Sequence, residues 1–181
     1  SDEDAAGRRQ LHEWMEKAGL AVTIDDLGDM IGLRQGAENG DPVILASHCD
    51  TVVRGGRYDG ALGVLGGLEV IRTLNDHNIQ TLKSIALVNW TNEEGVRFEP
   101  AMQAAGAVAG RFTRDEVYGR TDRAGIRFID ELRRIGFEGL SDHRPKPSAA
   151  LELHIEQGPV LEAAGVPVGI VGGIVGITWI E

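Results

Sequence analysis

Two apolar segments and the glycine-rich stretch between them most constrain how this chain can fold. PVILASH (42–48) and SIALVNW (84–90) are short continuous apolar runs, which are typical of strands buried on both faces of a sheet. Residues 60–75 lie between them and have apolar positions at helical spacing. Strands that alternate with helices predict the α/β class, here a mixed, largely parallel sheet with helices on both faces.

The same patterns predict the remaining elements. Helical spacing of apolar residues predicts three further helices, at 2–18, 101–109 and 124–135. Short apolar or alternating runs predict strands at 21–26, 29–36 and 151–158, and one or two more within 166–181. In the segment LELHIEQG (151–158), the alternation places Glu152, His154 and Glu156 on one face of the strand.

Charge and composition exclude several classes of partner. The formal net charge of -10 argues against nucleic acid or an anionic membrane, because neither gains from so acidic a surface. No apolar run approaches the roughly 20 residues of a membrane span. The N-terminus has no signal-peptide core, and the single cysteine, Cys49, fits a reducing compartment. We therefore expect a cytoplasmic protein without a nucleic-acid or membrane partner.

Side chains that bind metal ions follow the predicted strands. His48 ends the first buried strand, Glu93 and Glu94 follow the second, and His154 lies on a later one, while Asp59 opens the helix after the first strand. In an open α/β sheet the ligand site lies beyond the carboxyl ends of the strands. Two histidines and several carboxylates, without a pair of cysteines, suit Zn²⁺, Mn²⁺ or a similar ion.

Each of these residues also has a structural interpretation. A histidine at a strand end, such as His48, is often only a hydrogen-bonded polar residue, and Asp50 can simply start a turn. Asp59 can cap the following helix, and His154 can face solvent. Cys49 is best interpreted as a small buried residue. By themselves, these spacings indicate only a candidate metal hydrolase.

Three longer segments resemble one enzyme family. They are SHCDTVVRGGRYDGALGVLGGLEVIRTL, ALVNWTNEEGVRFEPAM and LELHIEQGPVLEAAGVPVGIVGGIVGITW. In this order they resemble the hydantoinase/carbamoylase family of amidohydrolases, within the wider M20 peptidase-like group of dinuclear zinc aminoacylases and carboxypeptidases. The family includes N-carbamoyl-L-amino-acid hydrolases, β-ureidopropionases and allantoate amidohydrolases.

The resemblance implies roles for the residues around the first strand. His48 matches a ligand of the first metal ion, and Asp50 matches the carboxylate that supports it. Asp59 matches the carboxylate that bridges two ions. The family also implies a cis peptide bond after the bridging residue, here between Asp59 and Gly60.

The other two segments complete the implied site. Glu93 matches the general base that takes a proton from the attacking water, and Glu94 matches a ligand of the second ion. His154 matches the remaining ligand of the first ion. Because that ligand is usually a carboxylate in aminoacylases and carboxypeptidases, His154 favours the carbamoylase branch. Gln157 matches a residue that contacts the substrate. The implied cofactors are two divalent ions, Zn or Mn, with Co or Ni as alternatives.

The implied activity is hydrolysis of a linear amide C–N bond in a small molecule. The resemblance favours removal of the carbamoyl group from N-carbamoyl-L-amino acids, or from a related ureido compound such as allantoate. One alternative is an aminoacylase or peptidase of the same group. Another is a non-catalytic form that binds metal or a partner. A phosphate- or nucleotide-binding module is disfavoured, because neither G-x-x-x-x-G-K-[ST] nor G-x-G-x-x-G occurs.

The chain also departs from the family pattern. Family members are longer, and the late histidine of their second metal site has no counterpart after His154. We therefore expect an incomplete catalytic metal-binding domain at 1–175, truncated before the lid domain, and the start of the lid and dimerisation domain at 176–181. The resemblance implies a homodimeric parent and little or no turnover by the isolated chain. Asp29 stands where the family usually has Asn.

Overall fold

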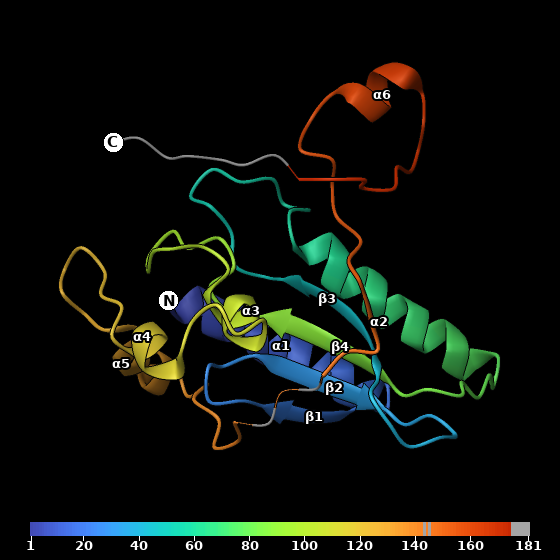
Figure 1. The fold of residues 1–181 in the computed structure, drawn as a ribbon, viewed down its shortest axis with the longest axis horizontal. Helices are drawn as coiled ribbons and strands as arrows, with labels where there is room; N and C mark the ends of the chain where they lie inside the picture. Colours follow the sequence, from blue (N-terminus) through green and yellow to red (C-terminus); the bar gives the residue numbers. More distant parts are fainter. Residues whose placement is uncertain (143, 145, 175–181) are drawn as a thin grey trace.

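Five strands form one mixed sheet in the computed structural model, which describes residues 1–142, 144 and 146–174. In their order across the sheet, the strands are β1 (Ala21–Ile24), β2 (Met30–Arg34), β4 (Ile85–Trp90), β3 (Val43–His48) and β5 (Ala149–Leu151) (Figure 1). β3 pairs in parallel with β4 and β5, whereas β2 pairs antiparallel with β1 and β4. The predicted mixed sheet is confirmed, and its described pairings are divided equally between the two directions.

The two apolar segments that predicted buried strands form β3 and β4 at the centre of the sheet. Four of their apolar residues are at most 2% exposed: Ile44, Ala86, Leu87 and Val88. This burial explains why both strands are apolar at successive positions rather than at alternate ones.

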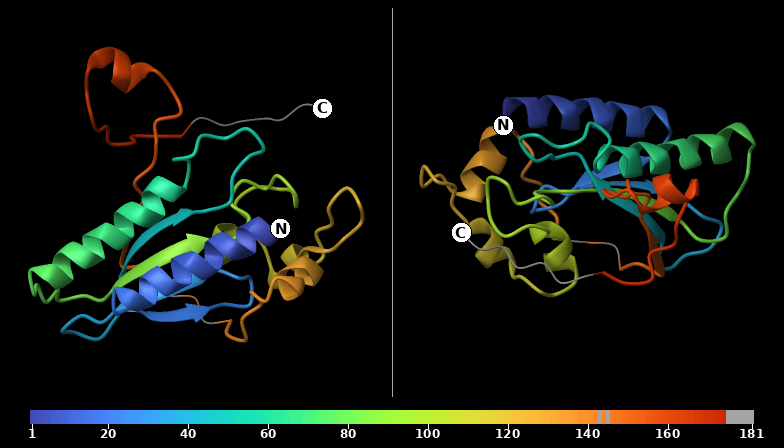
Figure 2. Two further views of the ribbon diagram at one scale, coloured as in Figure 1. Left: turned by 180° about the vertical axis from the view of Figure 1, so that it is seen from behind. Right: turned by 90° about the horizontal axis from the view of Figure 1, so that it is seen from above.

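The two long helices, α1 (Asp2–Lys17) and α2 (Ala61–Asp76), lie against the same face of the sheet (Figure 2). Their buried residues share one apolar core with the sheet, including Leu11, Met15, Val64, Leu68, Ile71 and Leu87. The opposite face carries a smaller cluster, formed by Ile31, Ile44, Ala46, Ala86 and Val88. Among the described residues, helix packing on the strands comes chiefly from α1 and α2. It therefore lies on one face, where the sequence predicted helices on both.

The connection from β4 to β5 contains α3 (Gln103–Val108), α4 (Arg114–Tyr118) and α5 (Phe128–Arg134). The sequence interpretation missed α4, although Thr113 and Glu116 form a capping box at its start and their spacing is a recognisable signal. α5 begins later than predicted, because the Asp122 carboxylate accepts the N–H groups of Ala124 and Ile126 in a turn before the helix.

The predicted strand at 151–158 is wrong over most of its length. β5 ends at Leu151, and residues 152–158 contain neither helix nor strand. β5 pairs only with β3 among the described strands, so no second ladder extends it. The strand prediction at 166–181 is also wrong for the described residues 166–174, and 175–181 lie outside the described part.

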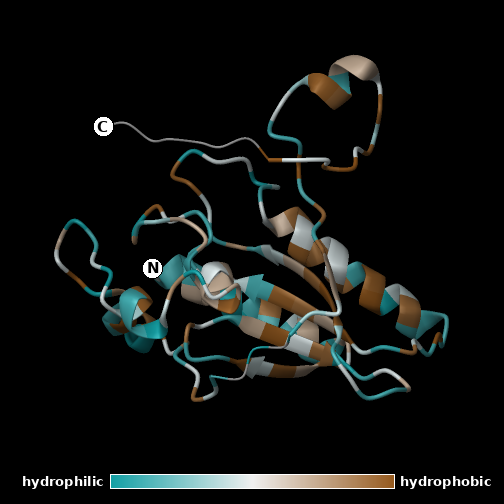
Figure 3. Ribbon diagram, viewed as in Figure 1, coloured by the Kyte–Doolittle hydropathy of each residue, from teal (hydrophilic) through white to brown (hydrophobic). Residues whose placement is uncertain are grey.

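The chain beyond β5 exposes many apolar side chains. It includes α6 (Val160–Ala164), and hydrophobic stretches occur in and around this helix (Figure 3). The exposed apolar residues here include Val160, Val168, Ile170, Val171 and Ile174. Within the described residues, no helix combines the length and the apolar character needed to cross a membrane.

The three parallel strands determine where a site can form. Because β3, β4 and β5 run in the same direction, their carboxyl ends lie at one edge of the sheet. The chain continues from these ends into residues 49–60, 91–102 and 152–158, which, together with His48 at the end of β3, carry the side chains predicted to form the site.

Candidate metal centre

Side chains from three separate segments meet at this edge of the sheet. His48, Asp59 and His154 each place one potential ligand atom within 4.8 Å of the others. The Oδ1 atom of Asp59 lies 3.2 Å from Nε2 of His154 and 4.0 Å from Nε2 of His48. The fold therefore brings together three of the four residues predicted to bind metal.

His48 is held at the end of β3, and one of its ring nitrogens is directed at the carboxylates of Asp59 and Glu93. The residue is 1% exposed, and its Nδ1 lies 2.8 Å from the backbone carbonyl oxygen of Asp50. Because a carbonyl only accepts, this contact places the proton of the neutral ring on Nδ1. Nε2 is then free to act as a ligand, and it lies 3.4 Å from Oε2 of Glu93.

A tight turn at Gly60 returns Asp59 to the site. The N–H of Ala61 donates to the carbonyl of Asp59 at 2.6 Å, and Gly60 has φ 63° and ψ -50°, as in a γ-turn. A Cβ atom at Gly60 would overlap the His48 ring, so both the backbone angle and the space require glycine. The Asp59–Gly60 bond is trans, so the predicted cis bond is wrong: the turn is made by the dihedral angles of Gly60.

The structure also decides between two interpretations of Asp59. The N-cap residue of α2 is Gly60, and no side chain caps the helix. The simpler interpretation of Asp59 as a helix cap is therefore wrong. Asp59 is 4% exposed, and its Oδ2 accepts a hydrogen bond from Nε2 of Gln157 at 2.6 Å. Gln157 thus reaches the site by contacting a carboxylate.

Asp50 organises the loop that follows β4. Its Oδ1 accepts the backbone N–H of Glu93 at 3.1 Å, and its Oδ2 accepts that of Glu94 at 3.0 Å. Its carboxylate lies 3.7 Å from Nδ1 of His48, so the predicted support of that ring comes from the Asp50 carbonyl instead. Sequence spacing did not indicate this role. The only signal was a loop with adjacent N–H groups in need of an acceptor.

The carboxylates of Glu93 and Glu94 lie in a crowded acidic environment. Burial raises the pKa of Glu93; His48 opposes this shift, and the negative charges of Asp50 and Glu94 add to it. Burial also raises the pKa of Glu94, and the charge of Asp59 adds to the effect.

Two buried oxygens in this cluster fit a bound cation. Oδ1 of Asp59 and Oε1 of Glu94 have no hydrogen-bond partner. Unpaired buried acceptors among like charges are costly, and a divalent cation compensates them. Imidazole nitrogens with carboxylate oxygens are also a suitable donor set for Zn²⁺ or Mn²⁺.

Residues 44–180 match the sequence profile of "Peptidase family M20/M25/M40". The chain belongs to this family. M20 enzymes are metal-dependent, and the His48, Asp59 and His154 cluster is a candidate metal-binding triad in this M20-family chain.

Several relatives carry the similarity further. The "N-carbamoyl-L-amino-acid amidohydrolase" of Rhizobium meliloti is 46% identical over 183 residues, which cover 100% of this chain and 44% of that protein. The "Allantoate amidohydrolase" of Bacillus subtilis (strain 168) is 36% identical over 166 residues, which cover 90% of this chain and 40% of that protein. A crystal structure of an amidase of the hydantoinase/carbamoylase family from Burkholderia multivorans matches with a TM-score of 0.88 and 48% identity, covering 91% of this chain and 41% of that one.

These matches confirm the resemblance predicted from the three motifs. They also show that this M20-family chain spans less than half the length of the relatives it matches.

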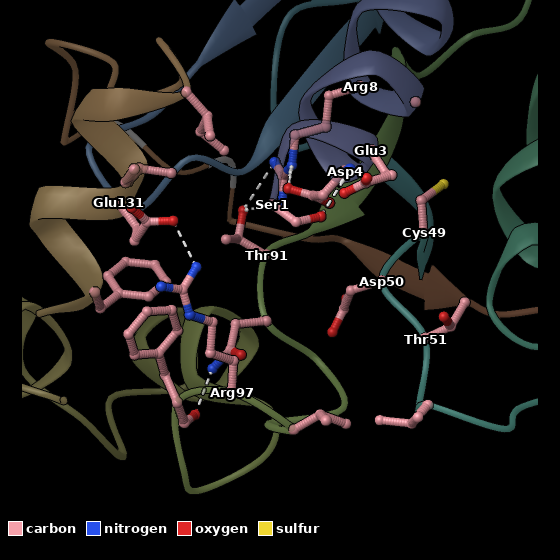
Figure 4. Close-up of a pocket in the computed structure, with 18 residues that line it drawn as sticks. Ser1, Glu3, Asp4, Arg8, Cys49, Asp50, Thr51, Thr91, Arg97 and Glu131 are labelled. Atoms are coloured by element: carbon pink, nitrogen blue, oxygen red, sulfur yellow. Dashed lines mark hydrogen bonds and ion pairs between the residues drawn. The ribbon is translucent and has the colours of Figure 1, made fainter. Parts of the chain in front are cut away.

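A cavity of about 570 Å³ has Asp50 in its lining, but none of the three clustered ligand residues (Figure 4). It is lined by the start of α1, the loops after β3 and β4, and α5, with Cys49, Arg97 and Glu131 among its residues. Burial raises the pKa of the Cys49 thiol to about 11, so the thiol is protonated at neutral pH. This supports the interpretation of Cys49 as a packing residue.

Proposed function

We propose that this chain forms the metal-binding part of an amidohydrolase that cleaves a linear amide C–N bond, with an N-carbamoyl-L-amino acid as the favoured substrate. The convergence of His48, Asp59 and His154 at the carboxyl edge of the sheet is the observation that carries this proposal. The names of the relatives favour carbamoyl and ureido substrates, and allantoate is the related alternative.

We assign the ligands as follows. His48, Asp59 and His154 would hold a first ion, and Asp59 would hold a second ion together with Glu94 and its unpaired oxygen. Zn or Mn is the expected metal, with Co or Ni as alternatives, because availability often decides among such ions. Ions held there would supply polarisation of the scissile carbonyl and a lowered pKa for a bound water.

Glu93 is proposed as the general base. Its Oε2 lies 3.4 Å from Nε2 of His48, and Asp50 fixes its backbone, so the carboxylate is held beside the proposed ligands. Glu93 accepts a proton from the attacking water and returns it to the leaving nitrogen. For an N-carbamoyl amino acid, one water is consumed, and the products are the amino acid, ammonia and CO₂. Gln157 is proposed to contact the substrate from its position against Asp59.

The complete activity is proposed to require more than this chain. Among the described histidines, only His48 and His154 lie in the cluster of potential ligands, so Asp59 and Glu94 are left to hold a second ion. We expect the isolated chain to bind the second ion weakly and to turn over little substrate. The domain division at 175/176, a homodimeric parent and a cytoplasmic location also remain proposals.

Metal retention provides the direct test of this function. Wild type, His48→Ala and His77→Ala are equilibrated with Zn²⁺ or Mn²⁺, desalted and assayed for bound metal by elemental analysis. His77 is exposed near the end of α2 and serves as the matched control. We expect retention in wild type and His77→Ala, and loss in His48→Ala. Equal retention in all three proteins contradicts the assignment.

The substrate class needs a separate assay. The rates at which the longer parent protein hydrolyses N-carbamoyl amino acids, allantoate and N-acetyl amino acids are compared, with and without a chelator. Chelator-sensitive hydrolysis of N-carbamoyl substrates supports the proposal. Preference for N-acetyl substrates would instead indicate an aminoacylase.

A further inference from the structure

The segment that carries His154 is held by few contacts, and the hydrogen bond from Gln157 to Asp59 is one of them. After Leu151 the chain leaves the pairing with β3, and residues 152–158 contain no helix or strand. Leu151 and Leu153 are 58% and 50% exposed, so burial of apolar surface contributes little to its position. The Nδ1 atom of His154 lies 2.9 Å from the carbonyl of the adjacent Ile155, a contact within the same segment.

One side-chain hydrogen bond joins this segment directly to β3. The Oγ of Ser47 donates to Oε1 of Glu152 at 2.7 Å. Ser47 directly precedes His48, and Glu152 lies two residues before His154. The bond therefore connects the two backbone segments that supply the two histidines.

The backbone of helix α2 at Gly63 packs against both of the segments that this bond joins. A Cβ atom at Gly63 would lie 2.5 Å from the carbonyl oxygen of Leu153 and 2.8 Å from Oγ of Ser47. The backbone of α2 is thus in close contact with Ser47 on β3 and with Leu153, next to Glu152. Ser47 is 0% exposed, so Glu152 supplies an acceptor where water has no access to the serine.

We propose that Ser47 and Glu152 are positioning residues that set His154 in the metal centre, an inference that rests on the function proposed above. A histidine on an untied segment must be ordered each time an ion binds, and that ordering costs affinity. The Ser47–Glu152 bond keeps this segment in place before the ion arrives. Groups that hydrogen-bond a metal ligand directly typically change metal affinity about 10- to 100-fold, and we expect a bond that orders the ligand's backbone segment to act at the lower end of that range.

Zn²⁺ affinity, measured by competition with a chromogenic chelator, tests the proposal. Ser47→Ala and Glu152→Ala should each weaken binding about 10-fold or more. Glu152→Gln should retain most of the affinity, because its side-chain oxygen still accepts from Ser47. Ser148→Ala is the matched control: Ser148 precedes the same β3–β5 pairing, and its Oγ bonds to the carbonyl of Pro42 at 3.0 Å. It should bind like wild type.

Two further measurements separate loss of the Ser47–Glu152 bond from general destabilisation of the protein. The double variant Ser47→Ala/Glu152→Ala should bind no more weakly than either single variant, because both remove the same bond. In the metal-free protein, hydrogen exchange at 152–158 should accelerate in Ser47→Ala and Glu152→Ala but not in Ser148→Ala. Because Glu152 is exposed, its variants keep the test available even where Ser47→Ala fails to fold.

Different failures identify different errors. Wild-type affinity in Ser47→Ala and Glu152→Ala, with binding lost in His48→Ala, overturns the positioning role and leaves the metal centre intact. An equal loss in Glu152→Gln and Glu152→Ala also overturns it, because charge rather than the bond then determines affinity. Unchanged affinity in His48→Ala, or no binding by wild type, overturns the proposed metal centre and the positioning role with it.

Discussion

Replacing Asp29 with asparagine should stabilise this protein. Asp29 is 0% exposed in the turn before β2, and its Oδ1 accepts the N–H of Thr91 at 2.9 Å. Its Oδ2 is buried without a hydrogen-bond partner. Burial raises the pKa of Asp29 well above its usual value, and the charge of Asp25 adds to the effect. Asparagine keeps the acceptor for Thr91, removes the charge and places a donor near the negative Asp25.

The expected gain follows from the unpaired oxygen. A buried acceptor left without a partner costs about 1–3 kcal/mol, so we expect Asp29→Asn to raise the free energy of unfolding by about that amount at pH 7. The sign depends on pH. Because the pKa is raised in the folded state, the folded protein keeps this proton at pH values where the unfolded chain, with a pKa of about 3.9, has lost it.

Wild-type stability should therefore fall as pH rises above about 4, by up to about 1.4 kcal/mol per pH unit, until the pKa of folded Asp29 is passed. The variant lacks this contribution, so its advantage should be small near pH 4 and should grow toward neutral pH. Asp25 also has a raised pKa, mainly because of burial, and it contributes a slope of the same sign in both proteins.

Urea unfolding followed by tryptophan fluorescence between pH 4.5 and 8 measures this difference. Asp41→Asn is the matched control, because Asp41 is exposed in the loop before β3, and it should change stability by less than about 0.5 kcal/mol. A lower free energy of unfolding for Asp29→Asn at pH 7 would refute the reasoning. So would a difference from wild type that does not change with pH.

Three further predictions test the site and the packing around it. Asp50→Ala leaves two N–H groups of the loop after β4 without their acceptor. Zn²⁺ affinity, measured by chelator competition, should therefore fall about 10- to 100-fold. Wild-type affinity in this variant would contradict the role of Asp50 in that loop. Gly63→Ala places a Cβ 2.5 Å from backbone and should cost about 1–3 kcal/mol in urea unfolding, whereas Gly7→Ala, in open space on α1, should be neutral or stabilising. A stable Gly63→Ala protein would show that α2 can move aside. Arg144→Ala removes the guanidinium whose Nε lies 2.8 Å from the buried carboxylate of Asp25. Thermal unfolding should therefore show that the free energy of unfolding falls by about 2–4 kcal/mol. A fall of less than about 1 kcal/mol would mean that this carboxylate finds another partner.

The sequence predicted those elements whose stability depends on their own pattern. β3 and β4 were recognisable because burial on both faces requires apolar residues at successive positions. α1 and α2 were recognisable because each buries one stripe of apolar residues at helical spacing. The prediction failed at 151–158, where the alternation was that of a strand but the described structure supplies a pairing partner only as far as Leu151.

The sequence also predicted which residue types bind the metal, because histidine and carboxylate side chains are suitable ligands in any fold. Their positions after strand ends predicted that His48, Asp59 and His154 would meet, and the parallel arrangement of β3, β4 and β5 explains why they do. The roles of the supporting residues were not readable. Asp50 reaches the N–H groups of a loop 43 and 44 residues away, and Ser47 reaches a carboxylate 105 residues away.

The sequence by itself determined which segments form the central strands and long helices, and which residues have the chemistry to bind a metal ion. These properties are local, because they depend on side-chain type and on spacing within one segment. Only the tertiary structure decided which carboxylate supports which loop, how Gly60 turns Asp59 back to His48, and what ties the His154 segment to β3. The Asp50 and Ser47 contacts join residues far apart in the chain. Hydrogen bonds of this kind form only where folding has already brought donor and acceptor within about 3 Å.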